Sequence, residues 1–259
     1  MSEEKILVEI IDHVGVFTLC NPPANALSQE LKDEFLMRLA EISSNEAVRA
    51  LIITGAGDKF FAAGADVPSL LELDHDSGLQ RILKIRDFYE GVAAFEKPVI
   101  GSINGICMGG GLELALCCDI RVAADHARLG LPEVGLGIIP GAGGTQRLPR
   151  IVGPGWANCL LMTGQHINAQ DALRIGLVQA VSPLKNLHET AFTIAKKIAD
   201  NGPVAVRAVK KASATNMQHT LQEGLEFESR LFAEVCGTAD KNEGVNAFLQ
   251  KRKPQFQGR

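Results

Sequence analysis

Three consecutive glycines, Gly109 to Gly111, separate a short β-like run at residues 98–100 from an apolar segment that begins at Leu112. The apolar segment predicts a buried helix. The first N–H groups of a helix have no partner within it and carry partial positive charge. Glycines at that point allow a ligand to approach the backbone closely, because no Cβ stands in the way. The junction therefore predicts a helix start that can stabilise an anion, including the oxyanion formed when a carbonyl or thioester is attacked or enolised.

Two carboxylates lie in the otherwise apolar surroundings of this junction. Glu113 falls in the first turn of the expected helix, and Glu133 follows twenty residues later, between Pro132 and Val134. If the chain folds back, Glu133 can face Glu113. Burial raises the pKa of a carboxyl group toward neutrality, so a buried pair suits general acid–base chemistry. An alternative stays open at this point: a tight turn that glycine permits, with Glu113 favoured only by the helix dipole.

The rest of the chain alternates between strand and helix patterns. Strands are expected at residues 6–9, 14–19 and 50–54, with a helix between the last two that Ser28 caps and a further helix at about 78–95. This alternation predicts an α/β fold with right-handed crossovers and a sheet covered by helices. Further short strands are expected at 121–123, 127–131 and 177–181, and helices at 144–152, 155–163 and 169–175.

The pattern becomes entirely helical from residue 183, with breaks near Gly202 and Gly237. We therefore divide the chain into an α/β core, residues 1–182, and a C-terminal helical region, residues 183–259, that packs or oligomerises. A length of 259 residues permits one large domain or two small ones.

Charge and cysteine usage exclude several classes of protein. The formal net charge of −4 argues against nucleic acid as the main partner. The six cysteines show no C-x-x-C spacing, and most lie within apolar runs. They are therefore expected to be small core side chains in a reducing compartment, and not disulfides or metal ligands. No secretory or transit signature and no run of about 18 apolar residues is found, so a cytoplasmic location and no membrane partner are expected.

Several familiar motifs are missing. No G-x-G-x-x-G follows a strand, so a dinucleotide cofactor is unsupported; the nearest run, beginning at Gly141, has Gln146 in place of the third glycine. Neither a phosphate-binding G-x-x-x-x-G-K-[ST] nor a G-x-S-x-G nucleophile elbow is present. His188 and Glu189 lack the second histidine of a zinc protease, and no metal site is expected.

Four motifs, in order along the chain, resemble the crotonase superfamily, and the match is closest to the enoyl-CoA hydratases. They lie at residues 61–66, 104–115, 132–137 and 140–148, and weaker matches extend the resemblance from Asn21 to Lys251, almost the whole chain. The resemblance implies a core of repeated ββα turns, a C-terminal helical part used for trimer formation, and trimers that often pair into hexamers. It also implies CoA thioester substrates, with no cofactor beyond the CoA that is part of the substrate.

The resemblance further implies a set of site residues. The N–H groups of Ala65 and Gly110 would form the oxyanion hole, Glu113 and Glu133 would be the catalytic acids, and Gly141 would direct its N–H toward the water. Other substrate or CoA contacts are implied at Ala24, Ala26, Ala63, Asp66, Val67, Pro68, Gly109, Pro132, Phe248 and Lys251.

Some of these residues have other interpretations. Where many hydratases have a lysine after Gly-Ala-Asp-Ile, this chain has Val67 and Pro68, so its hold on CoA is expected to lack a charged contact there. Asp66 is equally explained as a helix cap. Lys251 belongs to a basic tail, which is more often simply solvated, although in relatives Phe248 and Lys251 reach the CoA of a neighbouring subunit.

The implied reaction is the syn addition of water across the C2=C3 bond of a trans-2-enoyl-CoA, which gives a 3-hydroxyacyl-CoA. An enoyl-CoA isomerase or another crotonase-type lyase, including a dienoyl-CoA hydratase, is the alternative. Glu113 separates these, because an isomerase of this superfamily can work with the acid at Glu133 alone. Some relatives bind RNA through a lysine-rich helix, but here the helix with Arg81 and Lys84 also carries Asp87 and Glu90.

Overall fold

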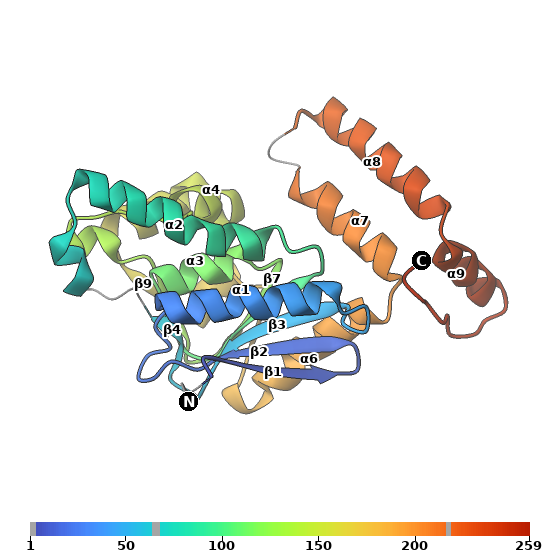
Figure 1. Ribbon diagram of the computed structural model, residues 1–259, viewed down its shortest axis with the longest axis horizontal. Helices are drawn as coiled ribbons and strands as arrows, with labels where there is room; N and C mark the ends of the chain where they lie inside the picture. Colours follow the sequence, from blue (N-terminus) through green and yellow to red (C-terminus); the bar gives the residue numbers. More distant parts are fainter. Residues whose placement is uncertain (1–3, 64–67, 216–218) are drawn as a thin grey trace.

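The computed structural model describes residues 4–63, 68–215 and 219–259, and Figure 1 shows two sheets wrapped by helices. Sheet A contains six strands in the order β1-β2-β3-β5-β7-β10. Only the β1–β2 hairpin is antiparallel; the other pairs are parallel. The strands are β1 (Ile6–Ile11), β2 (Val14–Leu19), β3 (Ala50–Gly55), β5 (Val99–Ile103), β7 (Ile120–Ala124) and β10 (Ala180–Ser182).

Sheet B is smaller and contains β4 (Phe60–Ala63), β6 (Ile106–Met108), β8 (Arg128–Gly130) and β9 (His166–Asn168), in that order. Three successive segments, β3-β4, β5-β6 and β7-β8, each place one strand in sheet A and the next in sheet B. Each of these pairs is followed by a helix. The expected α/β core of repeated ββα turns is confirmed, although strands β6 and β9 were not predicted.

The helices form a contiguous layer on the core. They are α1 (Gln29–Ser44), α2 (His75–Ala93), α3 (Gly110–Cys117) and α4 (Gly144–Thr163), and each packs on the next. Helix α3 packs against α2 and α4 (Figure 1), and its residues from Gly111 to Cys117 are all buried. The two helices expected at 144–152 and 155–163 are both present as the two parts of α4, which meet at Gly153, where the backbone is not helical (φ +78°, ψ 159°). Short helical segments η1 (Pro68–Glu72), η2 (Glu133–Leu136) and α5 (Ala169–Arg174) complete this part.

A chain of aromatic rings connects sheet A to the layer of helices. Phe17, Phe35, Phe88 and Tyr89 lie edge to face in succession, with centroid separations of 5.2, 5.2 and 5.0 Å. Such pairs contribute about 0.5–1.5 kcal/mol each beyond their burial. Tyr89, the last of these four rings, lies beside the start of α3. The packing of the aromatic rings therefore helps to position that helix.

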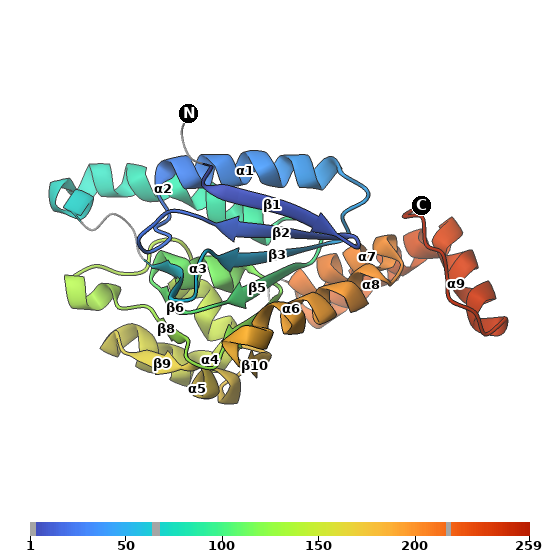
Figure 2. The ribbon, with the colours of Figure 1, turned by 90° about the horizontal axis from the view of Figure 1, so that it is seen from below.

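The C-terminal helices differ in how they relate to the sheets. Helix α6 (Leu184–Ala199) packs across the strands of sheet A, whereas α7 (Pro203–Ala214), α8 (Leu221–Cys236) and α9 (Ala239–Leu249) extend away from it (Figures 1 and 2). Arg49 ties the tail to the core by donating to the carbonyl oxygens of Ala199 (3.1 Å) and Phe256 (2.7 Å). The division at residue 183 stays a prediction, and α6 lies with the sheet.

Local details differ from the sequence predictions for identifiable reasons. Helix α2 begins at His75, earlier than expected, because Asp74 and Ser77 form a capping box. The last strand is β10 and not residues 177–181, because the N–H groups of Leu177 and Val178 both bond to the carbonyl of Ala172 at the end of α5.

The cysteines are divided between the core and the surface. Cys107, Cys117 and Cys118 are buried, but Cys159 and Cys236 are exposed, so the expectation of core thiols is wrong for those two. Over the three described ranges, no helix combines the length and apolar character that crossing a bilayer requires.

Candidate active site

The start of α3 is held against the edge of sheet B by backbone contacts that only glycine allows. Gly109 adopts φ +56°, ψ −128°, and its N–H donates to the carbonyl of Gly130 in β8 (3.0 Å). A Cβ on Gly111 would overlap the carbonyl of Ala62 in β4. The glycine run thus seats the helix start between β4 and β8, and the N–H of Gly110 belongs to the first turn, where no intrahelical acceptor exists.

Glu113 points from the first turn of α3 into the core and is only 4% exposed. Its Oε1 accepts two hydrogen bonds, from the N–H groups of Ala142 and Gly144, each at 2.8 Å. Ala142 lies in the loop that leads into α4, and Gly144 is the first residue of that helix. Burial raises the pKa of Glu113, while these two amides and the positive charge of Arg147 act in the opposite direction. Glu113 is therefore a buried carboxyl whose ionised form has dedicated hydrogen-bond donors.

Glu133 occupies a different environment at the start of η2. Its Oε2 is buried and has no hydrogen-bond partner among the described residues. Burial raises the pKa of Glu133 to about 7, and the charge of Glu113 contributes to the increase. The two acids are thus electrostatically coupled, and Glu133 is partly protonated near neutral pH.

Tyr89 of α2 is a site residue for which the sequence offers no motif. Its ring is buried, and its hydroxyl donates to the carbonyl oxygen of Gly110 at 3.3 Å. Burial raises the pKa of Tyr89, and the charges of Glu113 and Glu133 raise it further. A neutral phenol therefore lies beside the helix start and both acids.

Several of the residues implied by the resemblance lie near the start of α3. Ala63 ends β4, and its N–H donates to the carbonyl of Ala24 (3.1 Å), so the loop that contains Ala24 and Ala26 runs beside β4. Pro68 begins η1. The remaining three residues of this segment, Ala65, Asp66 and Val67, lie outside the described residues.

The other implied residues divide into two groups. Gly141 directly precedes the loop that holds Glu113, and its Cα lies against Ile82 of α2. Pro132 directly precedes Glu133 at the start of η2. Phe248 and Lys251 instead lie at the end of α9, which extends away from α3 within one chain (Figure 1). The fold of a single chain does not bring them to the acids.

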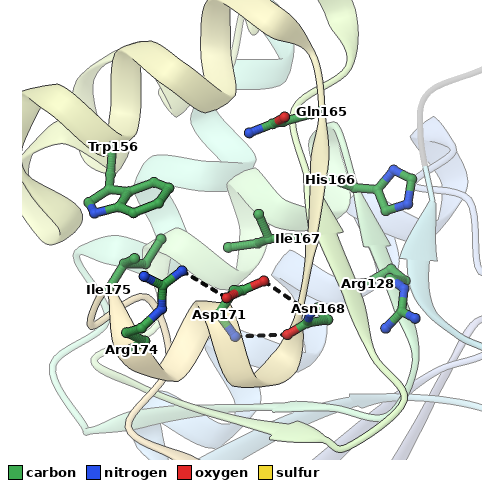
Figure 3. A pocket seen from close by; sticks show the side chains of 9 residues that line it. All are labelled: Arg128, Trp156, Gln165, His166, Ile167, Asn168, Asp171, Arg174 and Ile175. Atoms are coloured by element: carbon green, nitrogen blue, oxygen red, sulfur yellow. Dashed lines mark hydrogen bonds and ion pairs between the residues drawn. The ribbon is translucent and has the colours of Figure 1, made fainter.

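Two surface cavities are separate from the acid pair. A pocket of about 400 Å³ lies beside β9 and α5, and in its lining Asp171 bonds to Arg174 (2.8 Å) and to Asn168. Figure 3 shows these side chains. A larger groove of about 990 Å³ lies between the core and helices α7 and α8. Neither is lined by Glu113 or Glu133. In the ranges described, no three His, Cys, Asp or Glu side chains are grouped closely enough to hold a metal ion.

The two-sheet ββα spiral and the buried acids beside a glycine-rich helix start define a class, the crotonase-type proteins. The chain belongs to the enoyl-CoA hydratase/isomerase family, whose model matches residues 9–259. It is 43% identical over 254 residues to the short-chain-enoyl-CoA hydratase of Clostridium acetobutylicum, with 98% of this chain and 97% of that protein covered.

Two further relatives extend the comparison. The 2,3-dehydroadipyl-CoA hydratase of Escherichia coli is 41% identical over 260 residues, with 100% of both chains covered. The crystal structure of an enoyl-CoA hydratase from Bacillus anthracis superposes with a TM-score of 0.95 at 44% identity, and covers 99% of this chain and 100% of that one. The α/β fold with two sheets and C-terminal helices is therefore the crotonase fold.

Proposed function

We propose that this protein is an enoyl-CoA hydratase that adds water across the C2=C3 bond of a trans-2-enoyl-CoA to give a 3-hydroxyacyl-CoA. The observation that carries the proposal is the unequal environment of two coupled acids, one buried and the other half-buried. Glu113 has two N–H donors on one oxygen, and Glu133 has a buried oxygen without a described partner. Burial raises the pKa of both acids, but only Glu113 has N–H donors that stabilise its ionised form, while the pKa of Glu133 is raised to about 7. Such a difference suits a base and an acid that work at the same pH.

This difference supports an assignment of the two roles. The amides of Ala142 and Gly144 occupy Oε1 of Glu113, which leaves Oε2 to accept a proton from water. Glu133, with a pKa raised to about 7, supplies the proton to C2. Because the two groups are coupled, the titration they produce belongs to the pair.

The water oxygen bonds to C3 while its proton passes to Glu113, and the C2=C3 electron pair moves toward the thioester as an enolate. The N–H of Gly110, with that of Ala65, would bind the enolate oxygen, and the N–H of Gly141 would orient the water. C2 then takes the proton from Glu133, and the thioester carbonyl is restored.

Enoyl-CoA isomerisation is a second candidate, because one observation favours it as well. A carboxyl group with a pKa near 7 and an uncommitted buried oxygen, as at Glu133, can move a proton between two carbons without help from Glu113. The two hydrogen bonds that Glu113 accepts from the N–H groups of Ala142 and Gly144 have no role in that reaction. We therefore rank it second.

Oligomerisation is proposed on the same basis. Helices α8 and α9 expose Phe232, Phe248 and Leu249, which are 71%, 82% and 72% exposed. Exposed side chains of this kind are typical of surfaces that bind another protein chain. A homotrimer, or a dimer of trimers, would cover them and would let Phe248 and Lys251 reach the CoA of a neighbouring subunit. A cytoplasmic location remains part of this proposal.

The test is a spectrophotometric assay of the purified protein with a panel of trans-2-enoyl-CoA thioesters of increasing length, including branched, carboxylated and dienoyl chains. We expect loss of the conjugated enoyl-thioester absorbance and formation of 3-hydroxyacyl-CoA. A parallel arm supplies trans-3-enoyl-CoA, from which an isomerase would produce the conjugated thioester. Appearance of that product without hydration would replace the first proposal by the second.

A further inference from the structure

We propose that Arg147 is a positioning residue for hydration: it fixes the loop whose N–H groups hold Glu113, and Glu90 of α2 anchors its guanidinium. The inference rests on the proposed hydratase function and deepens it. Neither residue was singled out for such a role from the sequence.

A continuous run of polar contacts joins α2 to the buried acid. Arg147, in the first turn of α4, donates from Nη2 to Oε1 of Glu90 (2.8 Å) and from Nη1 to the carbonyl oxygen of Ala142 (3.0 Å). The N–H of the same Ala142 donates to Oε1 of Glu113 (2.8 Å). Residues 57 positions apart in the chain, Glu90 and Arg147, thus meet at the loop that orients the acid.

The guanidinium also packs on the next residue of the loop. Gly143 adopts φ +111°, and a Cβ there would overlap Nη1 of Arg147. The peptide unit that follows Gly143 carries the N–H of Gly144, the second donor to Glu113. Arg147 therefore contacts the backbone of Ala142 and Gly143, next to the two N–H groups that donate to Glu113.

Arginine suits this place better than lysine does. Its planar fork reaches two acceptors in different directions, here a carboxylate and a carbonyl oxygen, whereas lysine offers a single flexible ammonium. Only a fifth of the Arg147 side chain is exposed, while Glu90 is 58% exposed. The larger effect is therefore expected at Arg147, since exposed ion pairs contribute little on their own.

The charge of Arg147 has a second consequence. It favours the ionised form of Glu113, the form that accepts a proton from water. Among the described residues, the other titratable groups that interact with Glu113 are Glu133, Tyr89 and Cys117. Of these charged or titratable neighbours, only Arg147 is a cation, so its removal must move the titration of Glu113 upward.

The test compares Arg147→Met, Arg147→Lys and Glu90→Ala with Arg150→Met as the matched control. Arg150 lies one turn further along α4 and bonds only to the carbonyl of Gln146 among its described contacts. We expect Arg147→Met to lower kcat about 10- to 10²-fold with little change in KM, the order of loss that misplacement of a reacting group causes. Glu90→Ala should show a smaller loss, and Arg150→Met should match the wild type.

The pH profile of kcat separates positioning from general destabilisation. Arg147→Met should shift the acidic limb to higher pH, whereas Arg147→Lys, which keeps the charge but not the fork, should leave the limb in place and still lower kcat. A variant that is merely less folded would lose amplitude at every pH. Circular dichroism establishes folding, and if Arg147→Met does not fold, Arg147→Lys and Glu90→Ala carry the test.

The outcomes are distinguishable. An inactive wild-type protein would overturn the proposed function itself. An active wild type with Arg147→Met and Arg147→Lys both equal to Arg150→Met in kcat and pH profile would overturn the positioning role alone. Reduced kcat, unchanged KM and a shifted acidic limb would support it.

Discussion

The hydroxyl of Tyr89 lies 3.3 Å from the carbonyl oxygen of Gly110 and 2.7 Å from the point where a Cβ on that glycine would stand. The phenol thus occupies the space that a Cβ at position 110 would need, which favours glycine at the first position of α3. At Gly111 the obstacle is different, because a Cβ there would overlap the main-chain carbonyl of Ala62. A side chain can be shortened, but the backbone of a buried strand cannot move as readily.

This contrast predicts a rescue. Gly110→Ala should destabilise the protein by about 1–3 kcal/mol, as overpacking of a core commonly does. Tyr89→Phe removes the clashing oxygen, so the double variant should recover part of that loss, while Tyr89→Phe should not rescue Gly111→Ala. Urea unfolding of the three single variants and the two double variants measures this. Equal losses for Gly110→Ala with and without the tyrosine hydroxyl would show that the phenol is not the obstacle.

Glu133→Gln should remove most of the hydratase activity. The substitution preserves shape but leaves no transferable proton, so kcat should fall by about 10²- to 10⁴-fold, the usual contribution of a general acid or base. Acyl-CoA binding, measured by calorimetry with the saturated thioester, should change by no more than a few-fold. Activity close to that of the wild type would exclude Glu133 as the proton donor to C2.

The pH dependence of hydration should follow from the same group. Glu133 must be protonated to act, and its pKa is raised to about 7, so the rate should decline as the pH rises through about 7. At the acidic end, protonation of Glu113 should limit the rate. A bell-shaped profile for hydration is therefore expected, and in Glu133→Gln its basic limb should be absent. A rate that climbs steadily from pH 6 to pH 9 would be incompatible with these roles.

Stability should respond to pH in a way that reveals the buried acid. The pKa of Glu133 is higher in the folded protein than in the unfolded chain, so the folded state binds the proton more tightly. Below about pH 4.5 the group imposes no penalty, and between about pH 4.5 and 7 stability is lost as the buried carboxyl ionises. Glu133→Gln should therefore have a higher Tm than the wild type at pH 8, with a much smaller difference at pH 4.5. A difference that does not change with pH would mean that Glu133 ionises freely in the folded protein.

Much of the site was within reach of the sequence because its main parts are local. The glycines, the first-turn Glu113 and the later Glu133 each stand out within a short apolar window. The α/β alternation follows from the strand and helix patterns. The ββα order is what the resemblance implies, and the position of α3 against β4 and β8 depends on contacts with distant segments. Asn104, part of a motif in the same window, has a structural place instead: its buried amide bonds to both the N–H and the carbonyl of Gly55.

Other parts of the candidate site depend on contacts between segments far apart in the chain, and no local sequence pattern predicts such contacts. Tyr89 reaches Gly110 from another helix, and Glu90 reaches Arg147 across 57 positions. The pairing of Arg147 with the carbonyl of Ala142 depends on how α4 leaves its loop. The start of α2 was missed for a lesser reason: Asp74 followed by Ser77 is a readable cap, but the apolar pattern becomes regular only further along.

The most direct test of the account is the hydration of the four-carbon trans-2-enoyl-CoA by Glu113→Gln, measured beside the wild type and beside isomerisation of the trans-3-enoyl thioester. The glutamine oxygen can still accept the N–H groups of Ala142 and Gly144, so the fold and the loop should persist. The account predicts that kcat/KM for hydration falls by about 10² or more, because water loses its base. Hydration within about threefold of the wild type, by a folded variant, would contradict the two-acid mechanism.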